Sequence, residues 1–309
     1  MVTRWDLLAS GQPFPQMLLN ALRVESRRRG LLVTAYSFDP DYDPVEQGPT
    51  HLDLDLQNGR VDALLVSGLS SQDEQRMWSL GKPCVFLTQS RLLTPALNMR
   101  METMIVEGVR SLLRLGRRRI GLAYEVDPGN VAPSNRCLET FQQALQAEGV
   151  TENINWRMTF KPCNEYLRMV DASRQFHQLW ANEAGRPDGL LSVNDQFTAG
   201  LLHAAEVLGV RMPQELVVAS HSNKGLELFD AAEVVRLEYD PAQIAQMLLQ
   251  AAEDLLNSKP VEPIQEVPLQ VRWPKAWKIS KASGGGAGAA KSSNTISVAA
   301  GLAEKTLVS

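Results

Sequence analysis

The chain contains few side chains that could close disulfides or hold a metal ion. Only three of its 309 residues are cysteine, and they are far apart with no CxxC spacing. The four histidines form no HxH or HxxxH pair. A disulfide scaffold and a zinc site are therefore not expected, and a reducing compartment is favoured. We predict no metal site and no cofactor.

Long apolar runs are also missing. No run approaches the roughly 18 residues that a membrane-spanning helix needs. The opening segment MVTRWDLLASGQPFPQ does not resemble a signal peptide, because Asp6 and Pro13 interrupt its short apolar stretch. These absences predict a cytoplasmic protein with no membrane partner.

Evidence for nucleic-acid binding or catalysis is equally scarce. The formal net charge is −4, and the two Arg-Arg-Arg runs, at 27–29 and 117–119, are short. The first run ends an expected helix, where cations offset the helix dipole. The sequence has no GxSxG motif, no P-loop and no GxGxxG after a strand. We therefore expect no catalytic residues and no enzyme activity.

Apolar runs of strand length alternate along the chain with amphipathic helical segments. Strands are expected at 31–36, 61–66, 83–87, 120–124, 190–193 and 216–219, and helices at 17–29, 73–80, 101–115, 136–148 and 174–183. A further helix is expected to begin at Asn194-Asp195 and to end at Gly209. This alternation predicts an α/β fold in which parallel sheets are covered by helices on both faces. The strands are too many for one core, so two sheets are expected.

Polar residues follow two of the expected strands. Asn194 and Asp195 come after 190–193, and His221 comes after 216–219. Ligands of open α/β sheets bind outside the carboxyl ends of the strands, so a ligand would lie in the cleft between two such sheets. Asn194 and His221 are candidate contacts. The alternatives are a helix cap for Asn194 and a solvent-facing loop position for His221, while capping is the favoured role of Asp195.

The two ends of the chain differ from the middle. Residues 278–309 are rich in Gly, Ala and Ser, which predicts a flexible tail. At the start, only Met-Val-Thr precedes the first loop, so the first strand is expected to be truncated.

Six segments read GRVDALLVSG, GKPCVFL, VRSLLRLGRRRIGLAY, TFQQALQAEGV, PDGLLSVNDQFTAGLLHAAEVLGVRMPQELVVAS and LEYDPAQIAQMLLQAAEDLLN. Together they resemble the effector-binding core of the LacI/GalR family of bacterial transcription regulators, from about residue 1 to residue 273. The resemblance implies the type I periplasmic-binding-protein-like fold, with two lobes that are each a parallel sheet flanked by helices. The first lobe would comprise 1–100 with 238–262, and the second 101–237 with 263–273.

The resemblance also implies candidate ligand contacts. Asn194 matches the polar residue of the family's ND turn, and His221 and Thr88 stand where many members have a carboxylate. Arg136 lies one residue out of register with a family arginine, and its alternative is a surface pair with Glu139. The missing carboxylates make the usual hexose or pentose pattern doubtful. A neutral His221 donates and accepts, which would suit a neutral or an anionic effector.

Two aromatic residues complete the candidate site. Trp5 and Phe14 are expected in the loop after the first strand, where they would stack on a ring-shaped ligand. Their alternative role is packing within the lobe.

The leading hypothesis is the small-molecule sensing core of a LacI/GalR-type transcriptional regulator that forms a homodimer. Nothing in the sequence matches the family's helix-turn-helix domain, so operator DNA would be bound only through a domain absent from this chain. The alternatives are a solute-binding protein of a transporter and a stand-alone cytoplasmic ligand sensor.

Overall fold

The computed structural model describes residues 1–3, 13–38, 48–88, 94–128, 131–161, 165–226 and 233–274. They form two compact units. Unit 1 comprises Met1–Met101 and Tyr239–Pro268, and unit 2 comprises Glu102–Glu238 and the chain from Leu269. The expected boundary near 262 is therefore wrong, because residues 264–266 pair with a strand of unit 1. The expected tail, 278–309, lies outside the described residues.

The sheet of unit 1 has six strands in the order β11-β5-β4-β3-β1-β2. Their bounds are Val2–Thr3 (β1), Tyr36–Ser37 (β2), Leu64–Ser67 (β3), Cys84–Thr88 (β4), Ala96–Asn98 (β5) and Ile264–Glu266 (β11). Each neighbouring pair runs parallel. Because successive side chains of a strand point to opposite faces, Leu64 and Val66 belong to a different core layer from Leu65.

Helices cover both faces of this sheet. Helix α9 (Pro241–Leu256) packs on β3, β4 and β5, and α1 (Pro13–Arg29) packs on α9. The opposite layer receives Leu52 of α3 (His51–Gln57) and Met77 of α4 (Ser71–Ser79). Asp240 caps α9 by accepting a hydrogen bond from the Ala242 backbone N–H at 2.9 Å, and a proline follows at the first helical position, where no donor is lost.

The strand expected at 31–36 is mostly absent, and only Tyr36 and Ser37 pair with β1. Before Tyr36, the backbone oxygen of Thr34 accepts a hydrogen bond from the Met1 amino group at 2.6 Å. Leu32 is 91% exposed.

The sheet of unit 2 also has six strands, in the order β12-β10-β9-β8-β6-β7. Their bounds are Ile120–Glu125 (β6), Arg157–Phe160 (β7), Gly189–Ser192 (β8), Val217–Asn223 (β9), Val234–Tyr239 (β10) and Gln270–Arg272 (β12). Strands β7, β6, β8 and β9 run parallel, whereas β12 is antiparallel to β10. The predicted α/β architecture is therefore confirmed, with one antiparallel edge strand.

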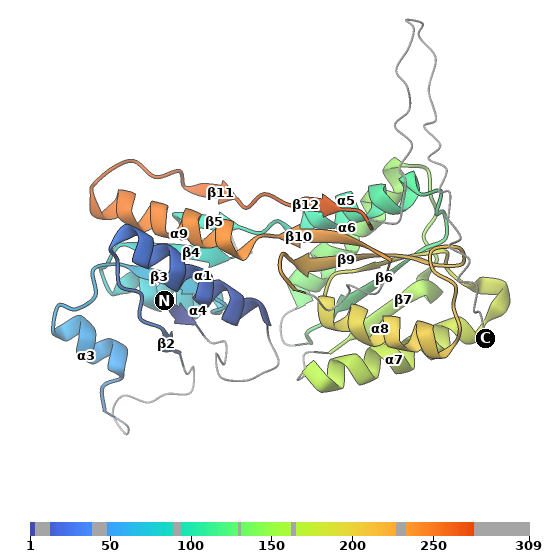
Figure 1. Ribbon diagram of the computed structural model, residues 1–309, viewed down its shortest axis with the longest axis horizontal. Helices are drawn as coiled ribbons and strands as arrows, with labels where there is room; N and C mark the ends of the chain where they lie inside the picture. Colours follow the sequence, from blue (N-terminus) through green and yellow to red (C-terminus); the bar gives the residue numbers. More distant parts are fainter. Residues whose placement is uncertain are drawn as a thin grey trace, which may run out of the picture. The chain divides into compact units, whose positions relative to one another are not determined.

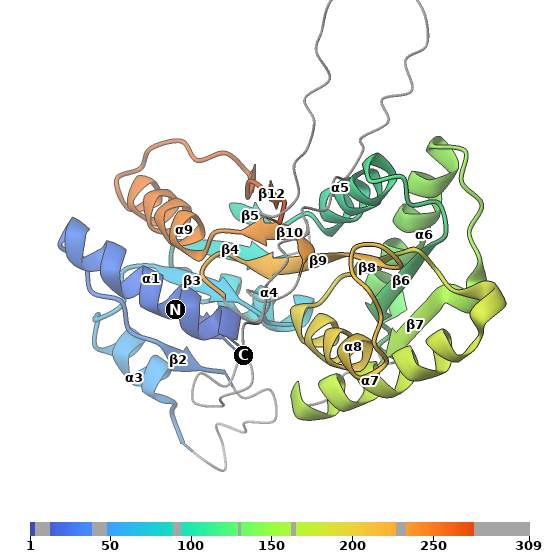
Figure 2. The same cartoon turned by 45° about the vertical axis from the view of Figure 1, so that its right-hand side comes forward.

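Two helix pairs cover the sheet of unit 2, one on each face (Figures 1 and 2). Helices α7 (Glu165–Ala181) and α8 (Asp195–Val207) pack closely together over one face, and α5 (Met101–Arg114) and α6 (Val131–Ala147) lie over the other. Two short 3-10 helices, Ile154–Trp156 and Glu183–Gly185, complete the unit. No helix among the described residues is long and apolar enough to cross a membrane.

The strand register of unit 2 aligns polar residues along one edge. Ala123 of β6 pairs with Ser192 of β8, and Ser192 pairs with Ser220 of β9. Because these strands are parallel, their carboxyl ends meet at the same edge of the sheet. Glu125, Asn194 and Ser222 each come two residues after this row. We call these residues and their polar neighbours Asp127, Asp195, His221 and Asn223 the polar edge of unit 2.

Candidate functional site

The amino terminus of α8 lies at the centre of the polar edge. Oδ1 of Asn194 accepts hydrogen bonds from the backbone N–H groups of Gln196 at 2.8 Å and Phe197 at 3.4 Å. These bonds satisfy two of the donors that the first turn of a helix leaves free. Oδ1 of Asn194 therefore caps α8, as the alternative role of this residue predicted. A contact between Asn194 and a ligand stays a prediction.

Asp195 is the first residue of α8 and is not the cap that we expected. The residue is buried, with 7% of its surface exposed. Nδ2 of Asn223, at the end of β9, donates a hydrogen bond to Oδ2 of Asp195 at 3.5 Å. No Lys or Arg among the described residues forms an ion pair with this carboxylate.

His221 lies within β9 and not beyond its end, because the strand continues to Asn223. Its imidazole is partly buried. Burial lowers the pKa of His221 below its ordinary value of 6.5, and the nearby Asp195 carboxylate opposes this effect. The imidazole is therefore mainly neutral near pH 7, with one donor and one acceptor nitrogen.

Two buried polar atoms beside His221 have no hydrogen-bond partner among the described residues. They are Oγ of Ser222 and Oδ1 of Asn223, on side chains that are 0% and 1% exposed. Buried polar atoms in native proteins nearly always have a partner. These two atoms, and Nε of Arg168, which is also buried without a described partner at this edge, are therefore suited to pair with a bound molecule.

Arg168 of α7 joins three elements at the same edge. Its Nη2 forms an ion pair with Oε2 of Glu125 at 3.2 Å, and its Nη1 donates to Oε1 of Gln196 at 3.0 Å. Burial raises the pKa of Glu125, the Arg168 charge opposes the rise, and nearby Asp127 adds to it. The arginine therefore holds the end of β6 against the first turn of α8.

A glycine places Arg168 in this position. A Cβ atom on Gly200 of α8 would lie 2.2 Å from the backbone oxygen of Met169, which no side chain could tolerate. Gly200 therefore allows the backbones of α7 and α8 to approach each other closely. The residue before Met169 is Arg168, so this close packing brings its guanidinium to Gln196.

Unit 1 has a smaller group of buried polar atoms at the carboxyl ends of its strands. Oγ of Ser67, at the end of β3, and Oε2 of Glu74, in α4, are buried and have no hydrogen-bond partner among the described residues. The Glu74 carboxyl also shares a hydrogen bond with Thr88, at the end of β4. Burial raises the pKa of Glu74, and the hydrogen bond with Thr88 opposes the rise.

A family model described as a periplasmic binding protein-like domain matches residues 109–273. The chain belongs to this family. The predicted resemblance to the effector-binding core of LacI/GalR regulators is confirmed together with the predicted fold.

Known relatives agree with this assignment. The uncharacterized HTH-type transcriptional regulator YkvZ of Bacillus subtilis is 20% identical over 207 residues, which are 67% of this chain and 61% of that protein. A LacI-family regulatory protein of Chloroflexus aggregans has a TM-score of 0.73 at 15% identity, covering 92% of this chain and 98% of that one. The lac repressor dimer bound to operator and the anti-inducer ONPF has a TM-score of 0.68 at 19% identity, covering 87% and 90%. The chain spans less than two thirds of the length of YkvZ.

The remaining predicted contacts of this periplasmic-binding-protein-like chain belong to α6, to unit 1 or to the part of the chain outside the described residues. Arg136 is exposed on α6, and its neighbour Cys137 points into the core. Phe14 is the second residue of α1, so its expected place in a loop is wrong. Trp5 lies outside the described residues. The ligand roles of Arg136, Phe14, Trp5 and Thr88 stay predictions.

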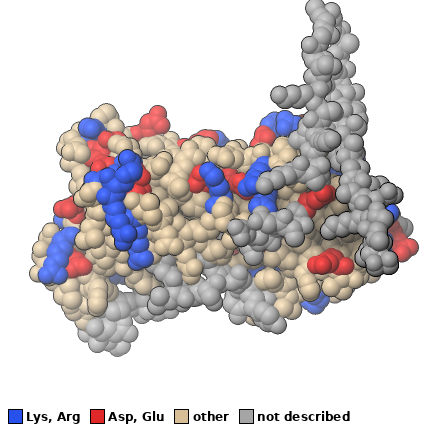
Figure 3. Space-filling model, in the orientation of Figure 1, with Lys and Arg blue, Asp and Glu red and all other residues tan. Residues whose placement is uncertain are grey.

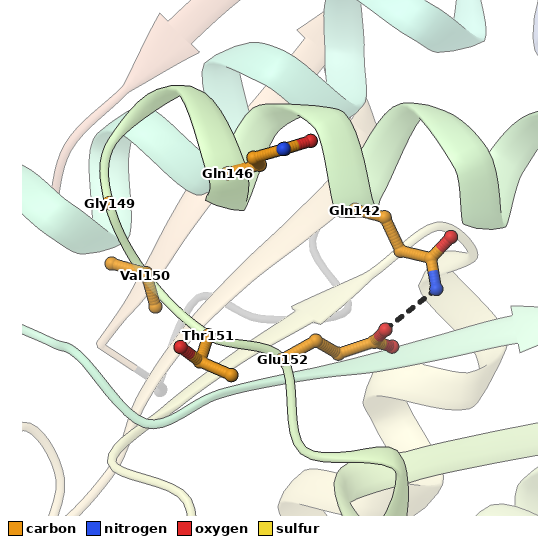
Figure 4. Close-up of a pocket in the computed structure, with 6 residues that line it drawn as sticks. All are labelled: Gln142, Gln146, Gly149, Val150, Thr151 and Glu152. Carbon is orange, nitrogen blue, oxygen red and sulfur yellow. Dashed lines mark hydrogen bonds between the residues drawn. The ribbon is translucent and has the colours of Figure 1, made fainter.

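A surface recess of about 440 Å³ opens elsewhere on unit 2 (Figure 4). It is lined by Gln142, Gln146, Gly149, Val150, Thr151 and Glu152. Nε2 of Gln142 donates to Oε2 of Glu152 at 2.8 Å, and Arg157 also donates to this carboxylate. The recess follows α6 and precedes β7, which places it near the amino ends of the strands, away from the polar edge.

Basic side chains do not dominate the face shown in Figure 3, where those of the described residues lie among acidic ones. Arg29 of the first arginine run, for example, forms ion pairs with Glu25 at 2.7 Å and Glu253 at 2.5 Å. The pair with Glu253 holds α1 against α9, while Glu25 belongs to α1 itself. The run therefore has a structural role.

Proposed function

We propose that this chain is the small-molecule sensing core of a LacI/GalR-type transcriptional regulator and binds a small polar effector at the polar edge of unit 2. The observation that carries the proposal is the pair of buried, unpartnered atoms, Oγ of Ser222 and Oδ1 of Asn223. They stand at the carboxyl ends of parallel strands, where ligands of α/β folds bind. Family membership supports a sensor and not an enzyme.

The names of the relatives favour a regulator over a transporter's solute-binding protein. YkvZ is named as an HTH-type transcriptional regulator, and the lac repressor structure contains both operator and a small molecule. By analogy, the intact protein would be a cytoplasmic homodimer that binds operator DNA through a helix-turn-helix domain. A ligand shifts such a regulator only by its differential affinity for the DNA-binding and non-binding states.

Ser222→Ala tests the position of the effector site. The Ser222 hydroxyl is buried without a partner, so replacing it with a hydrogen atom should leave the free energy of unfolding unchanged or slightly higher. A ligand that hydrogen-bonds to this hydroxyl should bind about fivefold more weakly, since one such bond contributes about 1 kcal/mol. The measurement is a thermal-shift screen of small polar metabolites, followed by calorimetry on each hit.

Gln146→Ala, in the recess of Figure 4, is the matched control, because it truncates a polar side chain at the opposite edge of the same unit. We expect it to leave every affinity unchanged. Hits that lose affinity with Gln146→Ala and keep it with Ser222→Ala would place the site in the recess and contradict the proposal.

A further inference from the structure

Three carboxylates and three basic side chains lie at this edge of unit 2: those of Glu125, Asp127 and Asp195, and those of Lys161, Arg168 and Lys224. Lys161 and Lys224 are exposed, whereas Arg168 pairs with Glu125. Arg168 already binds Glu125 at 3.2 Å and Gln196 at 3.0 Å. Its two Nη atoms are therefore engaged within the protein, and its Nε is buried without a partner among the described residues.

The carboxylate of Asp195 is in a different situation from that of Glu125. The residue is 7% exposed, and its carboxylate accepts a 3.5 Å hydrogen bond from the neutral side chain of Asn223. His221 beside it is held mainly neutral near pH 7 by burial. Lys224 follows β9 but is exposed, so solvent weakens its effect on a buried carboxylate. A buried carboxylate is best stabilised by a positive partner.

Neutral acceptors adjoin this carboxylate. Oδ1 of Asn223 belongs to the same amide that donates to Asp195, and it lacks a partner, as does Oγ of Ser222 in the preceding residue. Carboxylate and amide oxygens accept hydrogen bonds, and an ammonium group donates three. The described residues contain no group of three or more His, Cys, Asp or Glu side chains arranged to hold a metal ion, so an organic cation fits this edge better than a metal.

We propose that the effector of this sensing core is a small hydroxylated molecule with an ammonium group, which pairs with Asp195 while neighbouring hydroxyls meet Asn223 and Ser222. This inference rests on the proposed function and names the chemical class of the ligand. It replaces the expectation of a neutral or anionic effector, which considered His221 without the carboxylates around it.

The test compares matched sets of ligands by calorimetry on the full chain. Each set keeps one carbon framework and changes the charged group: glucosamine, glucose and glucuronate; glucamine, sorbitol and gluconate; 2-amino-1,3-propanediol, glycerol and glycerate. We expect the amine to bind most tightly in every set that binds. Tighter binding of the alcohol or the carboxylate would overturn the inference while leaving a sensing function in place. No binding by any member, while the screen of small polar metabolites yields another ligand, would overturn the inference and leave the sensing function in place.

Variants then assign the preference to Asp195. Asp195→Asn keeps the side-chain shape and should weaken amine binding about ten- to a hundredfold, because a hydrogen bond to a charged group is lost, and it should weaken binding of the matched alcohol much less. Glu206→Gln removes the same charge from the exposed far end of α8 and should change neither. Equal loss in both variants, or none in Asp195→Asn, would overturn the assignment.

Glu125→Gln gives a second test of the charge preference, and this test does not require Asp195→Asn to fold. Without Glu125, the charge of Arg168 is no longer compensated. We expect amines to bind more weakly and the matched carboxylates to bind more tightly. An unchanged order of amine, alcohol and carboxylate would contradict the charge argument.

Discussion

The side-chain amide of Asn223 donates through Nδ2 to Oδ2 of Asp195 at 3.5 Å, while Oδ1 of the same amide has no partner among the described residues. The carboxylate therefore fixes which end of the amide is presented to a ligand. A donor must face Asp195, so an acceptor is left at the other end. The last residue of β9 and the first residue of α8 thus act together in setting the chemistry of the polar edge.

Asn223→Asp should destabilise the protein strongly near neutral pH. It replaces the amide donor with a second buried carboxylate beside Asp195, and two adjacent carboxylates cannot both ionise cheaply. We expect a loss of about 1–3 kcal/mol in the free energy of unfolding at pH 7, from the missing hydrogen bond alone. The loss should shrink as the pH falls, because protonating one carboxyl of the pair removes the repulsion.

Urea unfolding of the wild type and Asn223→Asp at pH 7 and pH 5 measures this effect. Asn155→Asp makes the same change at an exposed position and should cost little at either pH. A loss that is equal at both pH values would show that the two side chains do not interact electrostatically.

His221 should make the stability of the protein sensitive to acid. Burial lowers its pKa in the folded state below the ordinary 6.5, so the unfolded chain takes up a proton at a higher pH than the folded chain does. Stability therefore falls as the pH drops below about 6.5, and His221 contributes no such loss above that value. His221→Gln removes the titration.

Melting temperatures measured between pH 5 and pH 8 test this sign. The wild type should lose stability relative to His221→Gln as the pH falls, and the difference should be constant above pH 7. His203→Gln, at an exposed position of α8, is the matched control and should follow the wild type. Parallel curves for the wild type and His221→Gln would mean that the imidazole is not buried in solution.

Much of the fold follows from local patterns in the sequence. The alternation of apolar runs with amphipathic segments predicted the two-sheet α/β fold, and Asn-Asp after Val193 predicted the start of α8. The end of β9 was missed because His221, Ser222 and Asn223 show no apolar alternation. Strand β11 was assigned to the wrong lobe because three residues of an edge strand carry no sign of their partner.

The polar edge was only partly predictable. Asn194 and His221 could be located because each lies near the end of an apolar run. Arg168 could not, since its contact with Gln196 joins residues 28 apart through the packing of two helices. Oδ1 of Asn223 lacks a partner because of where β9 ends relative to α8, which only the folded chain determines.

Gly200→Ala tests whether helix packing controls the polar edge. Alanine favours a helix by about 1 kcal/mol over glycine, so an isolated α8 would gain stability. In the folded protein, however, the new Cβ would lie 2.2 Å from the Met169 backbone oxygen, and a backbone atom cannot move without moving α7. We expect the free energy of unfolding to fall by about 1–3 kcal/mol, as for other overpacked sites. His203→Ala, which raises helix propensity at an exposed position of the same helix, should be neutral or stabilising.

The same variant should change ligand binding, because a displaced α7 moves Arg168 away from Gln196 and Glu125. The mutation leaves every polar side chain of the edge in place, so a change in affinity would have to come through the position of α7. Calorimetry with whichever ligand the wild type binds, at a temperature where Gly200→Ala is still folded, measures the effect. Lower stability with an unchanged affinity would show that the Arg168 bridge is dispensable for the site, and that the ends of β8 and β9 are sufficient to form it.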